Sequence, residues 1–509
     1  MQKLLLFSIL FCSTISFGQK MKFKVVGQKD TTIHLVRYYG KNLYYADTAD
    51  IKGGIVEFDG KKQKPGILAV LLPGQKYFEF IYNNEDINIE TEGPDFIKTM
   101  KVKKSEENKV FVDYMNYLIL KRTESGKVTE ERSKIKDDKS AEYKTLTAKL
   151  KSISDEVEKY QLDLIAANKE KLVSKIVKMS MEIHIPDAPK DKDGKITDSL
   201  FQYHYYRDHF FDNIDLKDER LVNSPIFQNK LETYFGKTMM VQHWDTIIKY
   251  AFDFCDRLDQ KTKTFEFCVT WITSTYEKSK IMGMDKVFNR MGQRYYCSTN
   301  SEGKSPAFWM PEDKLKDLCE KVEVQKNLVL GVAPPNICLR DTTDTKWVDF
   351  YSIKAEYTVL YFWDPECGHC KKTTPKLQRL YEEKLKARNI EVFSVAKAVG
   401  GDFELWKKFI KDNHLTFINV GLTEKLFKEA TEDARQFVPK YTSLEALNFS
   451  KTYDIFSTPR VFVLDKDKKI VAKQLSISQL EDFLDTMQKV KNAPKLFPPD
   501  PEEEEQMKQ

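Results

Sequence analysis

The stretch that decides the fold of this chain runs from Tyr357 to Lys371 and reads YTVLYFWDPECGHCK. Its first part, Tyr357–Trp363, is a continuous apolar run, which is typical of a strand buried on both faces. Cys367 and Cys370 then form a CxxC motif, and apolar residues at helical spacing follow them. A strand, a CxxC motif and a helix in this order predict a reactive cysteine pair at a helix N-terminus.

The chemistry of this position assigns a role to each residue of the motif. Unpaired backbone N–H groups and the helix dipole favour a thiolate at Cys367, which we expect to be the attacking nucleophile. Cys370 lies one turn further on, where it can resolve a mixed disulfide. Gly368 leaves Cys367 accessible, and His369 is expected to stabilise the thiolate with positive charge. Half of a zinc site and a structural disulfide are the alternative interpretations of one CxxC motif.

Alternating strands and helices surround this motif between residues 329 and 490, which predicts an α/β domain. After the helix that follows the motif, the expected elements are strand Ile390–Ala396, helix Asp402–Asn413, strand Leu415–Val420, an inserted helix Thr423–Arg435, strands Arg460–Asp465 and Lys469–Lys473, and helix Ser478–Lys489. Two prolines are notable: Pro375 lies inside the first helix, and Pro459 directly precedes a strand.

This region resembles the thioredoxin-fold proteins of the TlpA/ResA-like branch, which occur in bacterial cell envelopes. The matching segments are Gly331–Pro335, Tyr361–Cys370, Pro375 and Thr458-Pro459, within about a third of the chain. The resemblance implies a periplasmic thiol–disulfide oxidoreductase that needs no metal and no organic cofactor. It also implies a cis peptide bond at Thr458-Pro459 beside the CxxC motif, with Thr458 offering its backbone to an extended substrate strand.

Three positions depart from the family pattern. Glu366 stands where many relatives carry Trp, and Thr373 stands where TlpA/ResA-like proteins commonly carry a Glu that deprotonates the second cysteine. Tyr361 occupies the position of the buried Asp of thioredoxins. The sequence therefore does not identify a proton acceptor for Cys370.

The N-terminal region, residues 21–95, is predicted to be an all-β sandwich, because short β-branched and aromatic runs alternate with turn signals. The expected strands are Met21–Val26, Thr32–Tyr39, Asn42–Thr48, Gly54–Phe58, Gly66–Leu72, Tyr77–Tyr82 and Asp86–Glu90. No cluster of His, Cys and Asp suggests chemistry there, so we expect a structural or partner-binding role.

Residues 105–326 are predicted to form a central all-α region. In Ser140–Asn168 apolar residues alternate at spacings of three and four, which indicates an antiparallel helix hairpin closed by Lys169–Glu182 or, alternatively, a dimerising coiled coil. His204 and His209 are five residues apart, which does not suit two metal ligands on one helix face. Further helices are expected at Asp198–Asn213, Ser224–Asp259, Lys261–Lys278 and Pro311–Asn327.

The two ends of the chain are expected to lie outside the folded domains. Residues 1–18 have the layout of a secretory signal peptide cleaved before Gln19, with an uncleaved membrane anchor or a lipidated Cys12 as alternatives. The mature protein would then work in an oxidising compartment, the periplasm. Residues 498–509 are proline-rich and acidic, a composition that predicts disorder.

Composition limits the remaining possibilities. A net charge of +5 on 509 residues gives no reason to expect nucleic-acid binding. The other five cysteines of the mature chain are most simply small buried residues, although a structural bridge among them is possible: Cys255, Cys268, Cys297, Cys319 and Cys338. Expected partners are envelope proteins that carry thiols or disulfides and a membrane thiol electron donor. The alternative function is an envelope partner-binding protein whose thioredoxin domain is a redox-gated or non-catalytic docking module.

Overall fold

The computed structural model describes residues 19–399 and 401–498 of the chain. The chain divides into two compact units: the first comprises Met1–Gln242 and Phe254–Phe267, and the second comprises His243–Asp253 and Cys268–Gln509. The helical region predicted as one domain, 105–326, is therefore shared between the two units. The predicted signal peptide and nearly all of the predicted acidic tail lie outside the described residues.

The first unit begins with two four-stranded sheets, ordered β4-β1-β7-β8 and β3-β2-β5-β6. The strands are β1 (Lys20–Val26), β2 (Thr31–Tyr39), β3 (Asn42–Ile51), β4 (Ile55–Asp59), β5 (Gly66–Leu72), β6 (Lys76–Tyr82), β7 (Ile87–Glu92) and β8 (Lys101–Lys104), with the short helix α1 (Phe96–Thr99) before β8. Phe23 of one sheet meets Phe80 of the other with ring centroids 4.8 Å apart, so the sheets share one core. All seven predicted strands are confirmed.

A helical hairpin follows the sheets in the first unit. Its helices are α2 (Glu106–Ser133) and α3 (Ala141–Ala167), and the rings of Tyr117 and Tyr160 stack between them at 4.0 Å. The apolar seam predicted on α3 thus packs within the chain, as expected for a hairpin, but its main partner is the preceding helix. The next helices are α4 (Leu172–Ser180), α5 (Phe201–His209) and α6 (Pro225–Tyr234).

The remaining helices before the C-terminal domain are α7 (Trp244–Cys255), α8 (Lys263–Glu277), α9 (Asp285–Tyr295) and α10 (Glu312–Gln325). A single helix expected over Ser224–Asp259 is instead two, α6 and α7, because a break with Gly236 interrupts it. A disulfide joins Cys297 to Cys319, so two of the cysteines expected to be simple buried residues form a structural bridge.

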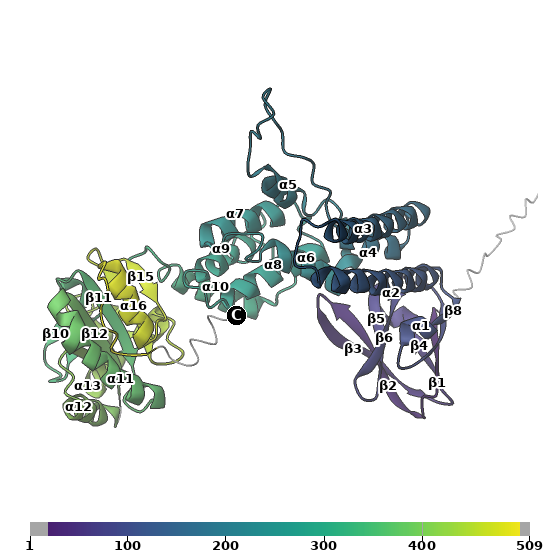
Figure 1. Cartoon of the computed structure of the whole chain (residues 1–509). Helices are drawn as coiled ribbons and strands as arrows, with labels where there is room; N and C mark the ends of the chain where they lie inside the picture. Colours follow the sequence, from purple (N-terminus) through teal and green to yellow (C-terminus); the bar gives the residue numbers. More distant parts are fainter. Residues whose placement is uncertain (1–18, 400, 499–509) are drawn as a thin grey trace, which may run out of the picture. The chain divides into compact units, whose positions relative to one another are not determined.

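The C-terminal part of the second unit is a mixed seven-stranded sheet covered by helices on both faces (Figure 1). The strand order is β10-β9-β13-β12-β11-β14-β15, with β11 (Tyr357–Trp363) near the middle and fully buried. The other strands are β9 (Cys338–Asp341), β10 (Trp347–Asp349), β12 (Ile390–Ala398), β13 (Ile418–Thr423), β14 (Arg460–Asp465) and β15 (Ile470–Lys473). β11 pairs in parallel with β12 and antiparallel with β14.

Two apolar cores lie on the two faces of this sheet, because alternate residues of β11 point in opposite directions. One core contains Tyr361 and Trp363 with residues of α11 (Gly368–Leu380), α12 (Asp402–Asp412) and α16 (Ile477–Met487). The other contains Leu360 and Phe362 with residues of α13 (Glu424–Asp433), α14 (Leu444–Leu447) and α15 (Phe449–Thr452). This arrangement holds the end of β11, and the motif after it, between rigid layers.

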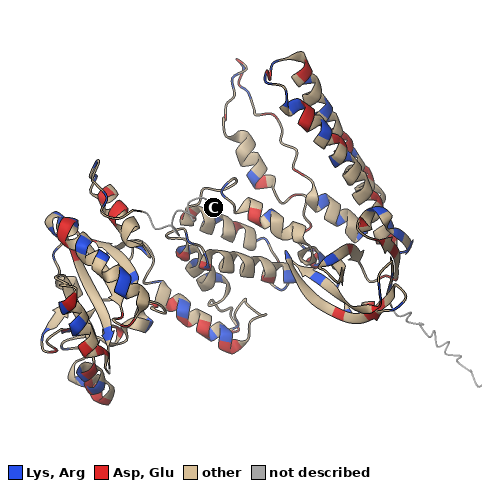
Figure 2. Cartoon of the chain, turned by 60° about the horizontal axis from the view of Figure 1, so that its bottom comes forward, with Lys and Arg blue, Asp and Glu red and all other residues tan. Residues whose placement is uncertain are grey.

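Charged residues of both signs are interspersed along the helices of the described chain, as Figure 2 shows for α2 and α3. Ion pairs one helical turn apart contribute to this pattern, such as Lys159 with Asp163 at 2.5 Å. Within residues 19–399 and 401–498, no helix combines the length and the apolar character that crossing a membrane requires.

Candidate active site

The CxxC motif lies at the start of α11, directly after the buried strand β11. Cys367 is the N-cap residue of α11, and its Sγ accepts a hydrogen bond from the backbone N–H of Cys370 at 3.4 Å. Cys367 is partly exposed, whereas Cys370 is fully buried. The strand–motif–helix order predicted from the sequence is confirmed, and it presents one sulfur to solvent and hides the other.

The Thr458-Pro459 peptide bond lies against this motif and is cis, as predicted. Cys367 Sγ is 3.3 Å from the carbonyl oxygen of Thr458, so residues 91 positions apart in the sequence meet at the reactive sulfur. Pro459 cannot donate a hydrogen bond to a neighbouring strand. The site residues expected from the sequence are therefore brought together, with Cys367 between the helix and the proline loop.

The pKa of the Cys367 thiol is lowered from its ordinary value. Burial acts to raise this pKa, but hydrogen bonds from the Thr458 side chain and from the Cys370 and His369 backbones together outweigh it. These donors stabilise the thiolate, the form that attacks disulfides. Cys367 is therefore chemically suited to be a nucleophile.

The Cys370 thiol has the opposite electrostatic environment. Burial raises its pKa to about 12, and the proximity of Cys367 raises it further, while the backbone of Asp364 and the Thr458 side chain oppose this. A thiol of this kind stays protonated at neutral pH and is protected from external reagents. The pair thus combines one accessible, acidic thiol with one buried, weakly acidic thiol.

Two hydroxyl groups lie in the core beneath the motif. Tyr361 Oη and Thr374 Oγ1 are 2.8 Å apart and buried. Burial raises the pKa of Tyr361, so its phenol is a neutral hydrogen-bonding group. Thr373 is half-buried on α11. The sequence indicated the departures at Tyr361 and Thr373, but not that Thr374 is the hydroxyl that pairs with the tyrosine.

The two residues between the cysteines are exposed. His369 contributes its backbone N–H to the hydrogen bonds around Cys367, and its side chain points into solvent. The ring's role as thiolate stabiliser stays a prediction. A methyl group placed on Gly368 would meet no atom within 4 Å, so packing does not require glycine there.

The remaining cysteines have environments unlike that of Cys367. Cys255 and Cys268 are fully buried, and burial raises the pKa of Cys338 to about 11. Across the described part of the chain, no group of three or more His, Cys, Asp or Glu side chains is placed to hold a metal ion. Cys367, in contrast, combines partial exposure with a lowered thiol pKa.

Comparisons with known proteins agree with this geometry. A family model described as thioredoxin-like matches residues 355–470, and a model described as a domain of unknown function matches residues 20–111. The thiol-disulfide oxidoreductase ResA of Bacillus thuringiensis subsp. konkukian is 24% identical over 163 residues, which are 31% of this chain and 79% of that protein. The ResA of Bacillus cereus matches to the same extent.

Solved structures include similar proteins. A domain of a possible thiol-disulfide isomerase from Cytophaga hutchinsonii is 34% identical, and the match covers 32% of this chain and 94% of that one, with a TM-score of 0.25. A thioredoxin-like protein from Bacteroides caccae is 15% identical over 60% of this chain and 98% of its own, with a TM-score of 0.42. The thioredoxin-like match and the ResA homologues show that the C-terminal domain is a TlpA/ResA-like, thioredoxin-fold thiol–disulfide oxidoreductase domain.

Proposed function

We propose that this protein exchanges disulfides with envelope proteins in the periplasm and that Cys367 and Cys370 carry the reaction. The observation that carries the proposal is the asymmetry of the pair. Cys367 is accessible, caps α11 and has a lowered pKa, whereas Cys370 is buried with a pKa of about 12.

The reaction proceeds in two exchanges. The Cys367 thiolate attacks one sulfur of a substrate disulfide, forming a mixed disulfide and releasing the other substrate sulfur as a thiolate. Cys370 then loses its proton and attacks the Cys367 sulfur, which releases the second substrate thiolate. The substrate gains two electrons, and the protein ends as the Cys367–Cys370 disulfide. A membrane thiol donor would reduce it again.

The proline loop supports a mode of substrate binding. Thr458 and Pro459 lie at the start of β14, beside the Cys367 sulfur. An extended substrate segment would run along Thr458 and form main-chain hydrogen bonds, as strands added to a sheet edge do.

Trapping of mixed disulfides tests the roles of the two cysteines. Cys370→Ser removes the resolving thiol, so it should accumulate substrates linked through Cys367, detected by mass spectrometry after non-reducing electrophoresis. Cys367→Ser should trap none, and Cys338→Ser is the matched control that should behave as wild type. Trapping through Cys338 or Cys255 would reject the assignment.

The proposed location is tested separately. We propose cleavage between Gly18 and Gln19. Gln19 is held by the sandwich, since its side chain accepts from Tyr82 Oη at 2.6 Å and its carbonyl accepts from Gly60 N–H at 2.8 Å. Mass spectrometry of the mature N-terminus should find Gln19 first; a lipid-modified Cys12 would contradict both the cleavage site and the soluble periplasmic location.

A further inference from the structure

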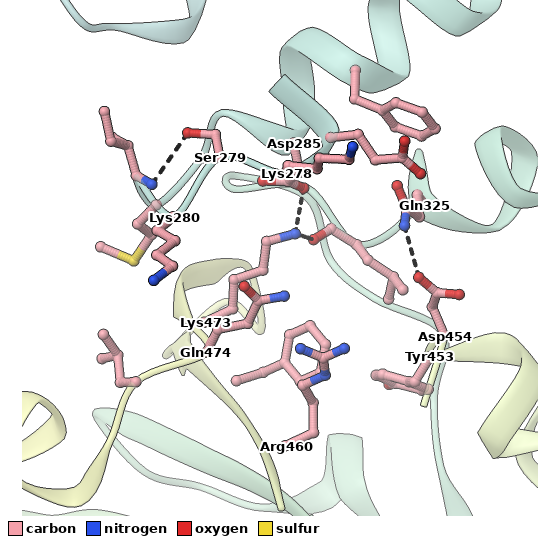
Figure 3. Close-up of a pocket in the computed structure, with 18 of the residues that line it drawn as sticks. Lys278, Ser279, Lys280, Asp285, Gln325, Tyr453, Asp454, Arg460, Lys473 and Gln474 are labelled. Carbon is pink, nitrogen blue, oxygen red and sulfur yellow. Dashed lines mark hydrogen bonds and ion pairs between the residues drawn. The ribbon is translucent and has the colours of Figure 1, made fainter. Parts of the chain in front are cut away.

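A cavity of about 580 Å³ opens within the second unit (Figure 3). Arg460, which directly follows the proline loop of the site, is among its lining residues. One side comes from the segment that joins α8 to α9 and from α9 and α10. The other side comes from the start of β14, the end of β15 and the beginning of α16. Two parts of the chain far apart in sequence therefore enclose one space.

The cavity begins close to the reactive sulfur. Arg460 lines it and is two residues beyond Thr458, whose carbonyl lies 3.3 Å from Cys367 Sγ. Two residues span at most about 7 Å of backbone. An extended peptide rises about 3.3 Å per residue, so a side chain two to four residues from a bound substrate cysteine can reach the cavity.

The charges that line the cavity are predominantly positive. Five cationic side chains face three carboxylates, and the carboxylates already have partners. Lys321 pairs with Glu277 at 2.7 Å, Lys473 pairs with Asp285, and Gln325 donates to Asp454 at 2.7 Å.

Three cations are left without a carboxylate. Lys278, Lys280 and Arg460 have no ion-pair partner within the described residues. Lys278 and Lys280 are exposed, Arg460 is half-buried, and Figure 3 shows Arg460 rising from β14 toward the interior of the cavity. Ile281 and Met282 are also exposed, at 41% and 37%, on the same segment.

We infer that this cavity binds acidic side chains that flank the cysteine of the substrate polypeptide. The inference rests on the proposed function and specifies its substrate class as a protein segment with Asp or Glu within about four residues of the reacting cysteine. The three uncompensated cations provide the attraction, and Ile281 and Met282 provide apolar contact beside them. The helices before the thioredoxin-like domain thus contribute to substrate selection.

The experiment compares two peptides that differ only in charge. Each is a disulfide-linked dimer with a single cysteine, flanked on both sides by two Glu in one peptide and by two Gln in the other. Reduced full-length protein is mixed with each dimer in a single turnover, acid-quenched, and the released peptide thiol is quantified. At low salt the wild type should reduce the Glu peptide about fivefold faster, and this advantage should fall as salt rises.

Substitutions of the cavity's cations test whether the cavity causes the faster reduction of the Glu peptide. Lys278→Gln with Lys280→Gln should reduce the advantage to less than about twofold, and Arg460→Gln should reduce it similarly. The matched control is Lys425→Gln with Lys428→Gln, which makes the same charge change on α13. This helix follows β13, which β12 and β11 separate from β14 in the sheet. The control should retain the full preference, and it should reduce the Gln peptide at the wild-type rate, which also verifies that the control variant is folded.

The possible failures are distinguishable. If the wild type reduces both peptides equally at low salt, the acidic substrate class is wrong while the proposed function stands. If the lysine variant keeps the preference, the cavity is not its source. If neither peptide is reduced, the proposed function itself fails, and the inference fails with it.

Discussion

At the scale of single residues, the rate of product release should depend on how Cys370 loses its proton. Burial raises the pKa of this thiol to about 12, so it remains protonated over the whole physiological range. Its thiolate fraction therefore increases about tenfold for each pH unit below that value. Thr373, three residues further along the helix, has no carboxylate that could accept this proton.

We therefore predict that resolution of the mixed disulfide accelerates steeply between pH 6 and 9. Because burial raises the pKa of Cys370, its reactive thiolate forms only as the pH increases, so the rate of resolution rises with pH. Thr373→Glu should accelerate resolution at pH 7 by about tenfold, since it places a carboxylate base on α11, three residues after Cys370. Thr373→Gln is the matched control and should have no effect. Stopped-flow kinetics of a preformed mixed disulfide measure this, and a rate constant independent of pH would show that another group deprotonates Cys370.

A second residue-scale prediction concerns an apolar side chain at the site. Phe456 is 86% exposed and lies two residues before Thr458, so it offers an apolar surface to a bound substrate. Phe456→Ser should raise the KM for insulin in an insulin-reduction assay by about fivefold with little change in kcat. Partial burial of an aromatic ring against the substrate contributes about 1 kcal/mol to binding. Phe427→Ser, on α13 and 49% exposed, is the control. A fall in kcat at unchanged KM would contradict a binding role.

At the scale of elements, a buried carboxylate joins the sandwich to the helices of the first unit. Glu107 is 4% exposed and accepts hydrogen bonds from the backbone N–H groups of Leu172 and Val173, both at 2.8 Å. These N–H groups belong to the first two residues of α4, where no backbone carbonyl of the helix itself can accept a hydrogen bond from them. Glu107 also accepts from Asn83 at 2.7 Å, so one side chain connects α2, α4 and the loop after β6.

We predict that Glu107→Ala weakens this junction by about 2–3 kcal/mol, the cost of leaving buried donors without an acceptor. Hydrogen exchange of the full-length protein, followed by mass spectrometry, should show roughly 30- to 160-fold less protection at the start of α4. Glu106→Ala is the neighbouring control: Glu106 is exposed and pairs only with Lys109 at 2.7 Å. An equal loss of hydrogen-exchange protection in the Glu107→Ala and Glu106→Ala variants would indicate a general effect on helix α2.

Elements with strong local patterns were predictable from the sequence, and those formed by tertiary contacts were not. β11 and the sandwich strands were identified because β-branched and aromatic runs are separated by turn residues. α2 lies within the region predicted to be helical, but its bounds were not predicted because it buries only scattered residues along 28 positions. β9 and β10 were missed because four and three residues give no usable period. At the site, the CxxC motif and the cis-proline were recognisable, whereas the cavity depends on segments about 180 residues apart, Lys278–Lys280 and Arg460.

At the scale of the whole molecule, the second unit contains two cysteine pairs with different roles. Cys297 and Cys319 are bridged between α9 and α10, whose contact is close: Asn289 donates to the Val322 carbonyl at 2.7 Å. The CxxC pair is a dithiol with an accessible sulfur. Structural disulfides persist in oxidising compartments, so the Cys297–Cys319 bridge supports the proposed periplasmic location.

The two cysteine pairs should therefore have different reduction potentials in a redox titration of the full-length protein. Hydrogen bonds stabilise the Cys367 thiolate, and stabilising the reduced form makes a couple more oxidising, so we expect a CxxC potential above thioredoxin's value of about −270 mV. The Cys297–Cys319 bridge should be reduced only below about −300 mV, as is usual for structural disulfides. Alkylation at each potential, followed by peptide mass spectrometry, measures both pairs in one sample. His369→Pro should lower the CxxC potential and leave the bridge unchanged, because the substitution removes only the imidazole and the N–H beside Cys367. A bridge that is reduced before the CxxC pair would show that Cys297 and Cys319, too, take part in thiol exchange.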